Sequence, residues 1–339
     1  MTLTRRLAFL PAVATAIALF TQTVDAQERT LKISHQFPAA ASMDEGDFRD
    51  RLAQRFAKEV GERTNGELAF EIYPAASLSK PHPQFGAMQT GTIDVSVFPM
   101  AYATTHVPEI GVALLPGLVT SYEQALSWND SEIGDTLRAA MEAKGVKLLA
   151  WGWQAGASVS KVPQLTAEDV KGTKLRGPGR EVNFMLAAAG GGVTSMPSSE
   201  TYSAMQSGVL DAVWTVPTSL ISYRLYEHSK FAVPGGENPM YFAAVPLLMS
   251  KATFDALSES QQKVILEVGR EMDDFAVEAA KADDTRFAEV FRENGSEIQM
   301  MSPETVKEWQ AIARESSWME FAKSVEGGQA LIDLAVGTE

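Results

Sequence analysis

Apolar and polar residues in the first part of the chain follow a pattern that predicts a strand, a helix and a second strand. Residues 30–35 read as a short strand, and residues 68–73 form another that ends at Pro74. Between residues 47 and 64, apolar residues recur at the three- and four-residue spacing of an amphipathic helix. This order indicates parallel strands joined by a crossover, and therefore an α/β fold.

The same kind of pattern continues further along the chain. Helices are predicted over residues 133–144, 166–170 and 181–189, and strands over residues 146–151 and 173–176. Helices and strands therefore continue to alternate in this part of the sequence.

An eleven-residue pattern occurs twice. Residues 85–95 (FGAMQTGTIDV) return as residues 202–212 (YSAMQSGVLDA). Each copy predicts the end of a helix, a glycine in the left-handed conformation (Gly91 and Gly208) and a short apolar strand. Chance similarity is the alternative. Two copies indicate two lobes of similar α/β build, which would face a ligand cleft beyond the carboxyl ends of their strands.

A long apolar periodicity follows in the last third of the chain. Ser258 and Gln261 match a capping box, and apolar residues recur from 264 to 291. A single helix of this extent would measure roughly 50 Å, enough to run along both lobes. Two consecutive helices with a break near Asp283-Asp284 fit the pattern equally well.

The first 26 residues have the composition of a secretory signal peptide. Arg5 and Arg6 precede an apolar stretch at 8–20 that is short for a spanning helix, and small residues at 24–26 supply a cleavage site. The sequence contains no Cys, which excludes disulfides and lipid attachment at a cysteine. We expect an exported, periplasmic protein, with a retained membrane anchor as the alternative.

Charge and motifs narrow the function further. The formal net charge is −14, and it becomes −15 when Arg5, Arg6 and Asp25 leave with the leader. An acidic chain disfavours nucleic acid, whose binding depends on Lys and Arg. The four His residues are scattered, and no zinc, phosphate-loop or dinucleotide motif is present. We therefore expect a binding protein without metal or cofactor, and an anionic ligand would need a local cation in a cleft.

Several segments carry a resemblance when they are taken together. Residues 171–178 include the run Lys-Leu-Arg, and residues 199–211 read SETYSAMQSGVLD. With residues 35–38, 56–66 and 257–262, they occur in the order found in TRAP-transporter solute-binding proteins, and the chain resembles the DctP family over nearly its whole mature length.

The resemblance implies a fold and a function. The family fold is a two-lobed clam-shell with a long helix that spans both lobes. We expect residues 27–152 and 243–281 in lobe I, and residues 153–242 and 282–339 in lobe II. The resemblance also implies a non-catalytic protein, expected to be a monomer, that closes over an organic acid and delivers it to TRAP membrane permease subunits.

The carboxylate-binding arginine of the family corresponds to Arg176. A guanidinium offers a carboxylate two parallel charge-assisted hydrogen bonds in a fixed plane. A surface ion pair is the alternative role. Many members carry a second arginine shortly after the strand at 146–151, whereas residues 152–158 here contain no cation. Members that bind dicarboxylates or sugar acids often have Gln-Glu-Asn-Pro at the positions where residues 213–216 of this chain read Val-Trp-Thr-Val.

These departures remove charge from the expected pocket and add aromatic and apolar surface. Burying a second carboxylate without a cation would cost several kcal/mol, so we expect an organic monocarboxylate that is aromatic or otherwise hydrophobic, such as a benzoate-like or mandelate-like acid. The expected ligand contacts are Arg176, Trp214, Thr215, Trp153, Gln154, Gln36, Tyr102 and Ser198. Ordinary packing is the alternative for both tryptophans.

Two other functions remain open. One is a C4-dicarboxylate or sugar-acid receptor whose second cation comes from elsewhere, such as Arg224. The other, less favoured, is a periplasmic hydrolase or lyase that would use His35 as an acid or base.

Overall fold

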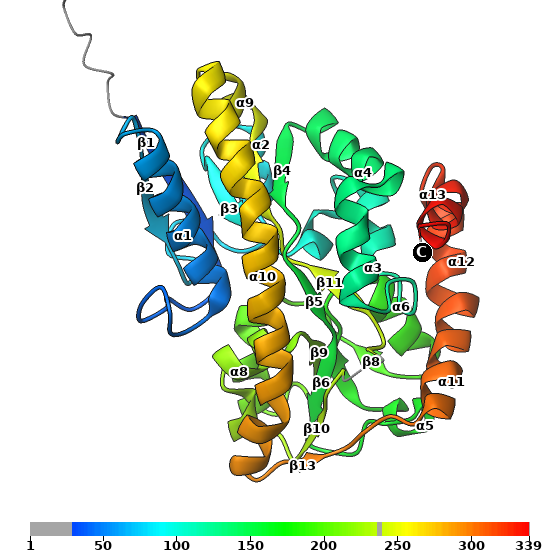
Figure 1. Cartoon of the computed structure of the whole chain (residues 1–339). Coiled ribbons are helices and arrows are strands. Elements are labelled where there is room, and N and C mark those ends of the chain that lie inside the picture. The colour runs from blue at the N-terminus through cyan, green and yellow to red at the C-terminus, as the bar shows by residue number, and fades with distance from the viewer. Residues whose placement is uncertain (1–28, 236–238, 339) are drawn as a thin grey trace, which may run out of the picture.

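The computed structural model describes residues 29–235 and 239–338 and shows two α/β lobes, each built on its own sheet (Figure 1). The expected leader at residues 1–26 lies outside the described residues. Within them, no helix has both the length and the apolar composition needed to cross a membrane. The predicted two-lobed α/β fold is confirmed.

Among the described residues, each lobe has a mixed sheet. The first has the order β2 (Leu68–Tyr73), β1 (Arg29–His35), β3 (Val95–Val97), β12 (Leu247–Ser250) and β4 (Val146–Ala150). The second has the order β13 (Glu297–Ile298), β10 (Phe231–Val233), β6 (Ala157–Ser160), β9 (Ala212–Thr215), β7 (Lys174–Arg176) and β8 (Gly192–Val193). We call the two halves of the molecule the first and the second lobe.

Helices cover both sheets. The α-helices are α1 (Phe48–Arg63), α2 (Gln84–Gln89), α3 (Tyr122–Ser127), α4 (Glu132–Ala143), α5 (Ala167–Val170), α6 (Arg180–Ala188), α7 (Thr201–Gln206), α8 (Pro217–Ser222), α9 (Lys251–Asp255), α10 (Glu259–Glu293), α11 (Pro303–Ala313), α12 (Met319–Ser324) and α13 (Gly328–Val336). Short 3₁₀ helices are η1 (Met100–Ala103), η2 (Pro108–Leu114), η3 (Trp128–Asp130), η4 (Ser198–Glu200) and η5 (Leu225–Glu227), and η6 (Arg314–Trp318) is a π-helical turn.

The predicted strand–helix–strand unit opens the first lobe. β1 and β2 pair in parallel, and α1 between them is capped by the Asp47 side chain. The apolar residues of α1, including Leu52, Phe56 and Val60, are buried in one cluster with the interior of the first sheet. The apolar periodicity of the sequence predicted α1 correctly, because a helix on a sheet must bury one apolar face.

The eleven-residue pattern forms the same structure in both lobes. A short helix ends at a glycine with positive φ, 70° at Gly91 and 75° at Gly208, and a central strand follows. The carboxylate of Asp94 accepts the backbone N–H of Lys32 on β1, and that of Asp211 accepts the backbone N–H of Lys174 on β7. Each aspartate thus joins its strand to the parallel neighbour in the same way, which confirms the repeated unit.

Two chain segments cross between the lobes as a pair of strands. β5 (Trp153–Ala155) follows β4 and leads into β6, while β11 (Phe242–Ala244) leads back to β12. β5 and β11 pair in an antiparallel ladder between the two larger sheets. This ladder is therefore the crossing point of the molecule.

Helix α10 runs along both lobes as one unbroken helix of 35 residues (Figure 1). Ser258 and Gln261 form the predicted capping box. The helix packs on α1 and β4 in the first lobe and on α8 and β13 in the second. The single long helix is thereby confirmed, and the alternative of a break near Asp283-Asp284 is wrong because apolar contacts continue through Phe287 and Phe291.

The C-terminal helices return to the first lobe. α11 packs on α6 of the second lobe, whereas α13 packs on α4 and η2. Phe321, Leu331 and Ile332 share one apolar cluster with Leu137 of α4. We expected residues 282–339 in lobe II. The end of this range, from Phe321 onward, packs against the first lobe instead.

Asp273 of α10 fixes the helix to the link between β4 and the crossing strand β5. Its carboxylate accepts the backbone N–H of Trp151 at 2.6 Å and the side-chain amide of Asn129 at 3.2 Å. Burial raises the pKa of Asp273 to about 6, because these hydrogen bonds replace only part of the lost hydration. A carboxyl with a raised folded pKa stabilises the fold most below its unfolded pKa near 4 and loses this contribution as pH rises through 6.

We therefore expect Asp273→Asn to reduce the pH dependence of stability. The shift of Asp273 corresponds to roughly 2 to 3 kcal/mol between pH 4 and 7, and the amide keeps an oxygen for the Trp151 N–H. Thermal unfolding from pH 4 to 7.5 should show a smaller fall of the melting temperature in this variant than in the wild type. Glu278→Gln, an exposed position of the same helix, is the control, and equal slopes in all three proteins would contradict the expectation.

Candidate functional site

A cavity of about 40 Å³ lies where the two lobes meet. Its walls come from segments that follow the carboxyl ends of parallel strands: Phe37 follows β1, Tyr102 follows β3, Pro178 follows β7 and Val216 follows β9. Open α/β sheets bind ligands at this edge. The cavity is therefore the candidate ligand site.

Arg176 is a buried cation at this cavity. It ends β7, and only 1% of its surface is exposed. Its Nε donates to the carbonyl oxygen of Met196 at 3.0 Å and its Nη1 to that of Trp214 at 3.3 Å. Among the described residues, its hydrogen-bond partners include no carboxylate. A buried guanidinium without a counterion is costly, so an anion in the cavity would be strongly stabilised.

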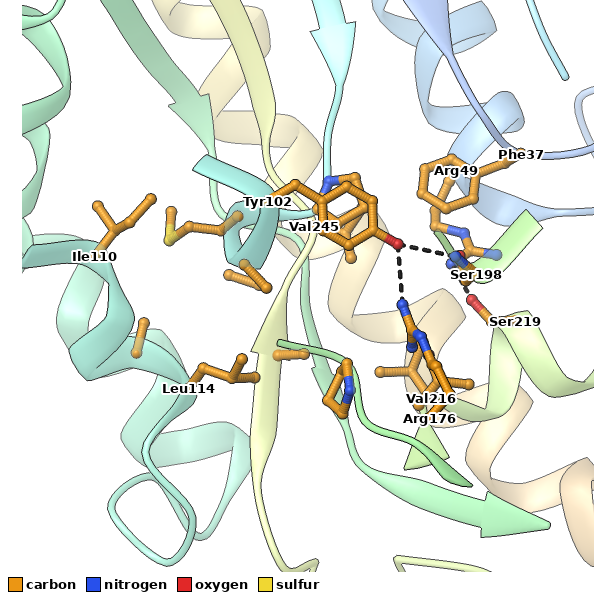
Figure 2. A pocket seen from close by; sticks show the side chains of 18 residues that line it. Phe37, Arg49, Tyr102, Ile110, Leu114, Arg176, Ser198, Val216, Ser219 and Val245 are labelled. Carbon is orange, nitrogen blue, oxygen red and sulfur yellow. Dashed lines mark hydrogen bonds between the residues drawn. The ribbon is translucent and has the colours of Figure 1, made fainter. Parts of the chain in front are cut away.

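The hydroxyl of Tyr102 joins Arg176 to the first lobe. It accepts hydrogen bonds from Arg176 Nη2 at 3.0 Å and from the backbone N–H of Ser198 at 2.9 Å, both drawn in Figure 2. Gln36 Nε2 lies at 3.4 Å from the same oxygen. With these bonds, three of the five guanidinium N–H groups of Arg176 are engaged in the described residues, and two are left for a ligand.

A second arginine, Arg49, lines the same cavity from the start of α1. Its Nε and Nη2 bind the two carboxylate oxygens of Asp47 at 2.9 and 2.6 Å. Its Nη1 donates to Ser219 Oγ at 2.7 Å across the lobe boundary, and its guanidinium stacks on the Phe37 ring at 3.7 Å. The charge of Arg49 is thus matched inside the protein.

His82 adds no further charge to this site. Its ring lies 4.5 Å from that of Tyr102. Burial, with the positive charge of Arg176 as a second cause, lowers the pKa of His82 below its usual 6.5. The imidazole is therefore neutral near pH 7.

The cavity has a polar end and an apolar end. Figure 2 shows Arg49, Arg176 and Ser198 together on one side, and Ile110 and Leu114 on the other. A small anion with an apolar body would match both ends.

Four expected contacts line the cavity: Arg176, Thr215, Tyr102 and Ser198. Gln36 contributes through the Tyr102 hydroxyl, and its Oε1 accepts Ser199 Oγ at 3.4 Å. These residues come from both lobes.

Three expected contacts lie outside the cavity lining: Trp214, Trp153 and Gln154. The Trp214 ring packs on Trp309, although its carbonyl oxygen accepts from Arg176. Trp153 stacks on Trp151 in the core of the first lobe. Gln154 is 1% exposed on crossing strand β5.

Two residues named in the alternative functions also lie elsewhere. Arg224, considered as a second cation, is exposed and paired with Glu227. His35, considered as an acid or base, binds the Asp50 carboxylate at 2.9 Å and is fully buried. Within residues 29–235 and 239–338, no cluster of three His, Cys, Asp or Glu side chains has the arrangement of a metal site.

Three residues of the cavity lining were not expected from the sequence: Arg49, Phe37 and Ser219. Arg49 sits in the acidic run of residues 44–50, where a basic side chain reads as an ordinary surface charge. One signal was present: on the predicted helix, Arg49 lies next to Phe48 at the buried end rather than on the solvent-facing stripe.

The family of the chain follows from its sequence. A family model described as bacterial extracellular solute-binding protein, family 7 (DctP) matches residues 40–324. The chain belongs to this family. DctP-family members are TRAP periplasmic solute-binding proteins, not enzymes, and they work with a TRAP permease.

Relatives match over nearly the full length. A solute-binding protein of Albidiferax ferrireducens is 45% identical over 314 residues, which cover 92% of this chain and 93% of the relative. The C4-dicarboxylate-binding periplasmic protein DctP of Rhodobacter capsulatus is 25% identical. That match covers 91% of this chain and 92% of the relative.

Solved structures share the fold. A TRAP periplasmic solute-binding protein from Rhodoferax ferrireducens, with bound malonate, has a TM-score of 0.88 at 45% identity and covers 91% of this chain and 98% of that one. A Bordetella pertussis extracytoplasmic solute receptor that binds pyroglutamic acid has a TM-score of 0.82 at 20% identity. The match covers 91% of this chain and 99% of that one. At 20% identity the likeness concerns the fold alone.

Gly179 permits close contact between the lobes beside the cavity. A Cβ at this position would lie 2.6 Å from Leu114 Cδ2 and 2.7 Å from Ala101 Cβ, both in the first lobe. The backbone of Gly179 is extended, with φ −173°, so the obstacle to a side chain is steric.

We expect Gly179→Ala to hold the lobes apart and to weaken organic-acid binding by about tenfold or more, since the ligand would lose contacts from one lobe. Titration calorimetry gives the affinity, and small-angle scattering gives the radius of gyration with and without ligand. Gly86→Ala is the matched control, because a Cβ there meets no atom within 4 Å. Wild-type affinity and compaction in Gly179→Ala would refute this role.

Proposed function

We propose that this protein captures a small organic monocarboxylate in the periplasm and delivers it to a TRAP permease. The observation that carries the proposal is the buried guanidinium of Arg176, which faces the cavity without a counterion in the described part of the chain. A ligand carboxylate would supply the missing charge and two hydrogen bonds.

The charge balance of the cavity supports one carboxylate rather than two. Arg49 is already neutralised by Asp47, and His82 is neutral. One positive charge is thus left for the ligand among the described residues. A dianion would bury an unmatched negative charge, at a cost of several kcal/mol.

The lining supports a compact apolar body. The end opposite Arg176 is formed by aliphatic side chains such as Met100, Ile110 and Leu114. The expectation of an aromatic ligand drew on Trp153, Trp214 and Tyr102; both tryptophans pack elsewhere, and Tyr102 alone of the three lines the cavity. We therefore favour a short branched aliphatic acid, with benzoate-like acids as competitors.

Delivery and location are inferred from the family. Its members are periplasmic and serve TRAP permeases, and the leader expected at residues 1–26 would direct export. The acidic net charge of −14 speaks against nucleic acid as a partner, and a monomer is the state we propose.

A dicarboxylate is the second candidate ligand. Two observations favour it: Arg49 lines the same cavity, and the 45% identical protein from Rhodoferax ferrireducens has bound malonate. Its second carboxylate would have to approach Arg49 while Asp47 already occupies that guanidinium.

A matched pair of ligands separates the candidates. Isovalerate has nearly the shape of malonate, with an isopropyl group in place of one carboxylate. We expect isovalerate to bind the mature protein more tightly than malonate in calorimetry and in a thermal-shift panel that also contains benzoate, mandelate, succinate and glucuronate. Tighter binding of malonate or succinate would overturn the monocarboxylate proposal.

We also expect Arg176→Met to abolish binding without harming the fold. Losing one partner of a buried charge pair costs roughly 2 to 5 kcal/mol, or at least thirtyfold in affinity. Replacing a buried unpaired cation by an apolar residue of similar volume should keep or raise the melting temperature of the free protein. Arg224→Gln, at an exposed ion pair, is the control. Retained affinity in Arg176→Met would exclude Arg176 as the anchor.

A further inference from the structure

The pair formed by Asp47 and Arg49 is placed to control which ligands the cavity accepts. The Asp47 side chain is fully buried, and its two oxygens bind Nε and Nη2 of Arg49 as a fork. Arg49 itself lines the cavity, on the same side as Arg176 (Figure 2). The second cation of the site is therefore present but compensated.

The position of Arg49 does not depend on Asp47 alone. Nη1 of Arg49 donates to Ser219 Oγ at 2.7 Å, and the Phe37 ring lies against the guanidinium plane at 3.7 Å. These contacts come from α8 in the second lobe and from the segment after β1 in the first. They would keep the guanidinium at the cavity wall if Asp47 lost its charge.

We propose that Asp47 is a specificity-determining residue, an internal counterion that occupies the second arginine of the cavity and so restricts the receptor to ligands with one carboxylate. This inference rests on the proposed function. A dicarboxylate would meet a guanidinium whose charge is already matched, with the Asp47 carboxylate close behind it. Without that carboxylate, Arg49 and Arg176 would match the two charges of a short dicarboxylate.

Asp47→Asn separates this role from the role of Asp47 in the fold. Asp47 is also the N-cap of α1, where its Oδ1 accepts the backbone N–H of Arg49 at 3.0 Å. Asparagine caps helices as well as aspartate does and has the same shape. Asp47→Asn therefore removes the negative charge and keeps the cap. Asp47→Ser is a second variant that is also neutral and also caps the helix.

The test compares malonate with isovalerate by titration calorimetry of the mature protein. We expect Asp47→Asn to raise the ratio of malonate affinity to isovalerate affinity by roughly tenfold or more. Asp47→Ser should shift the ratio in the same direction. Adding Arg49→Gln to Asp47→Asn removes the freed cation and should abolish the gain, which a merely structural effect of Asp47 would not do.

Asp50→Asn is the matched control. Asp50 lies in the same helical turn and is buried, but it binds His35 and the backbone N–H of Ala40 outside the cavity lining. The ratio of malonate affinity to isovalerate affinity in Asp50→Asn should stay at the wild-type value. An unchanged ratio in both Asp47 variants would overturn the inference, whereas a wild type that already prefers malonate would overturn the proposed function itself.

Discussion

The buried charge of Arg176 is the constraint on which the site depends. A guanidinium at 1% exposure can be tolerated only if its N–H groups find acceptors. The carbonyl oxygens of Met196 and Trp214 and the hydroxyl of Tyr102 supply these acceptors and fix the plane of the group. Neutral acceptors solvate the cation without cancelling it, so its charge remains available to an anion that enters the cavity.

Lobe contact and the proposed ligand site use the same residues. Tyr102 of the first lobe bonds to Arg176 and Ser198 of the second, and Arg49 bonds to Ser219 across the same boundary. A ligand between these residues would touch both lobes at once. Its binding energy would therefore favour the arrangement in which the lobes meet, which is how a ligand shifts a conformational equilibrium.

Most of the fold was predictable because it depends on local patterns. Periodicity located α1 and α10, and the repeated pattern with Gly91 and Gly208 identified one equivalent unit in each lobe. The pairing of the crossing strands and the packing of α13 were not predicted. Both depend on contacts between residues far apart in sequence, such as those of Leu137 with the C-terminal helix. No local pattern carries that information.

The site was predictable only in part, for two physical reasons. Neighbouring residues of a strand point to opposite faces, so Trp214 packs on Trp309 while Thr215, next to it on β9, reaches the cavity. Arg49 was missed because its place at the cavity depends on the approach of Ser219, 170 positions away in the sequence. A buried ion pair contributes little to stability compared with apolar residues of the same volume. Asp47 does cap α1, but a cap needs no charge, so the feature of the pair that bears on an entering anion is the compensation of Arg49, which lines the cavity.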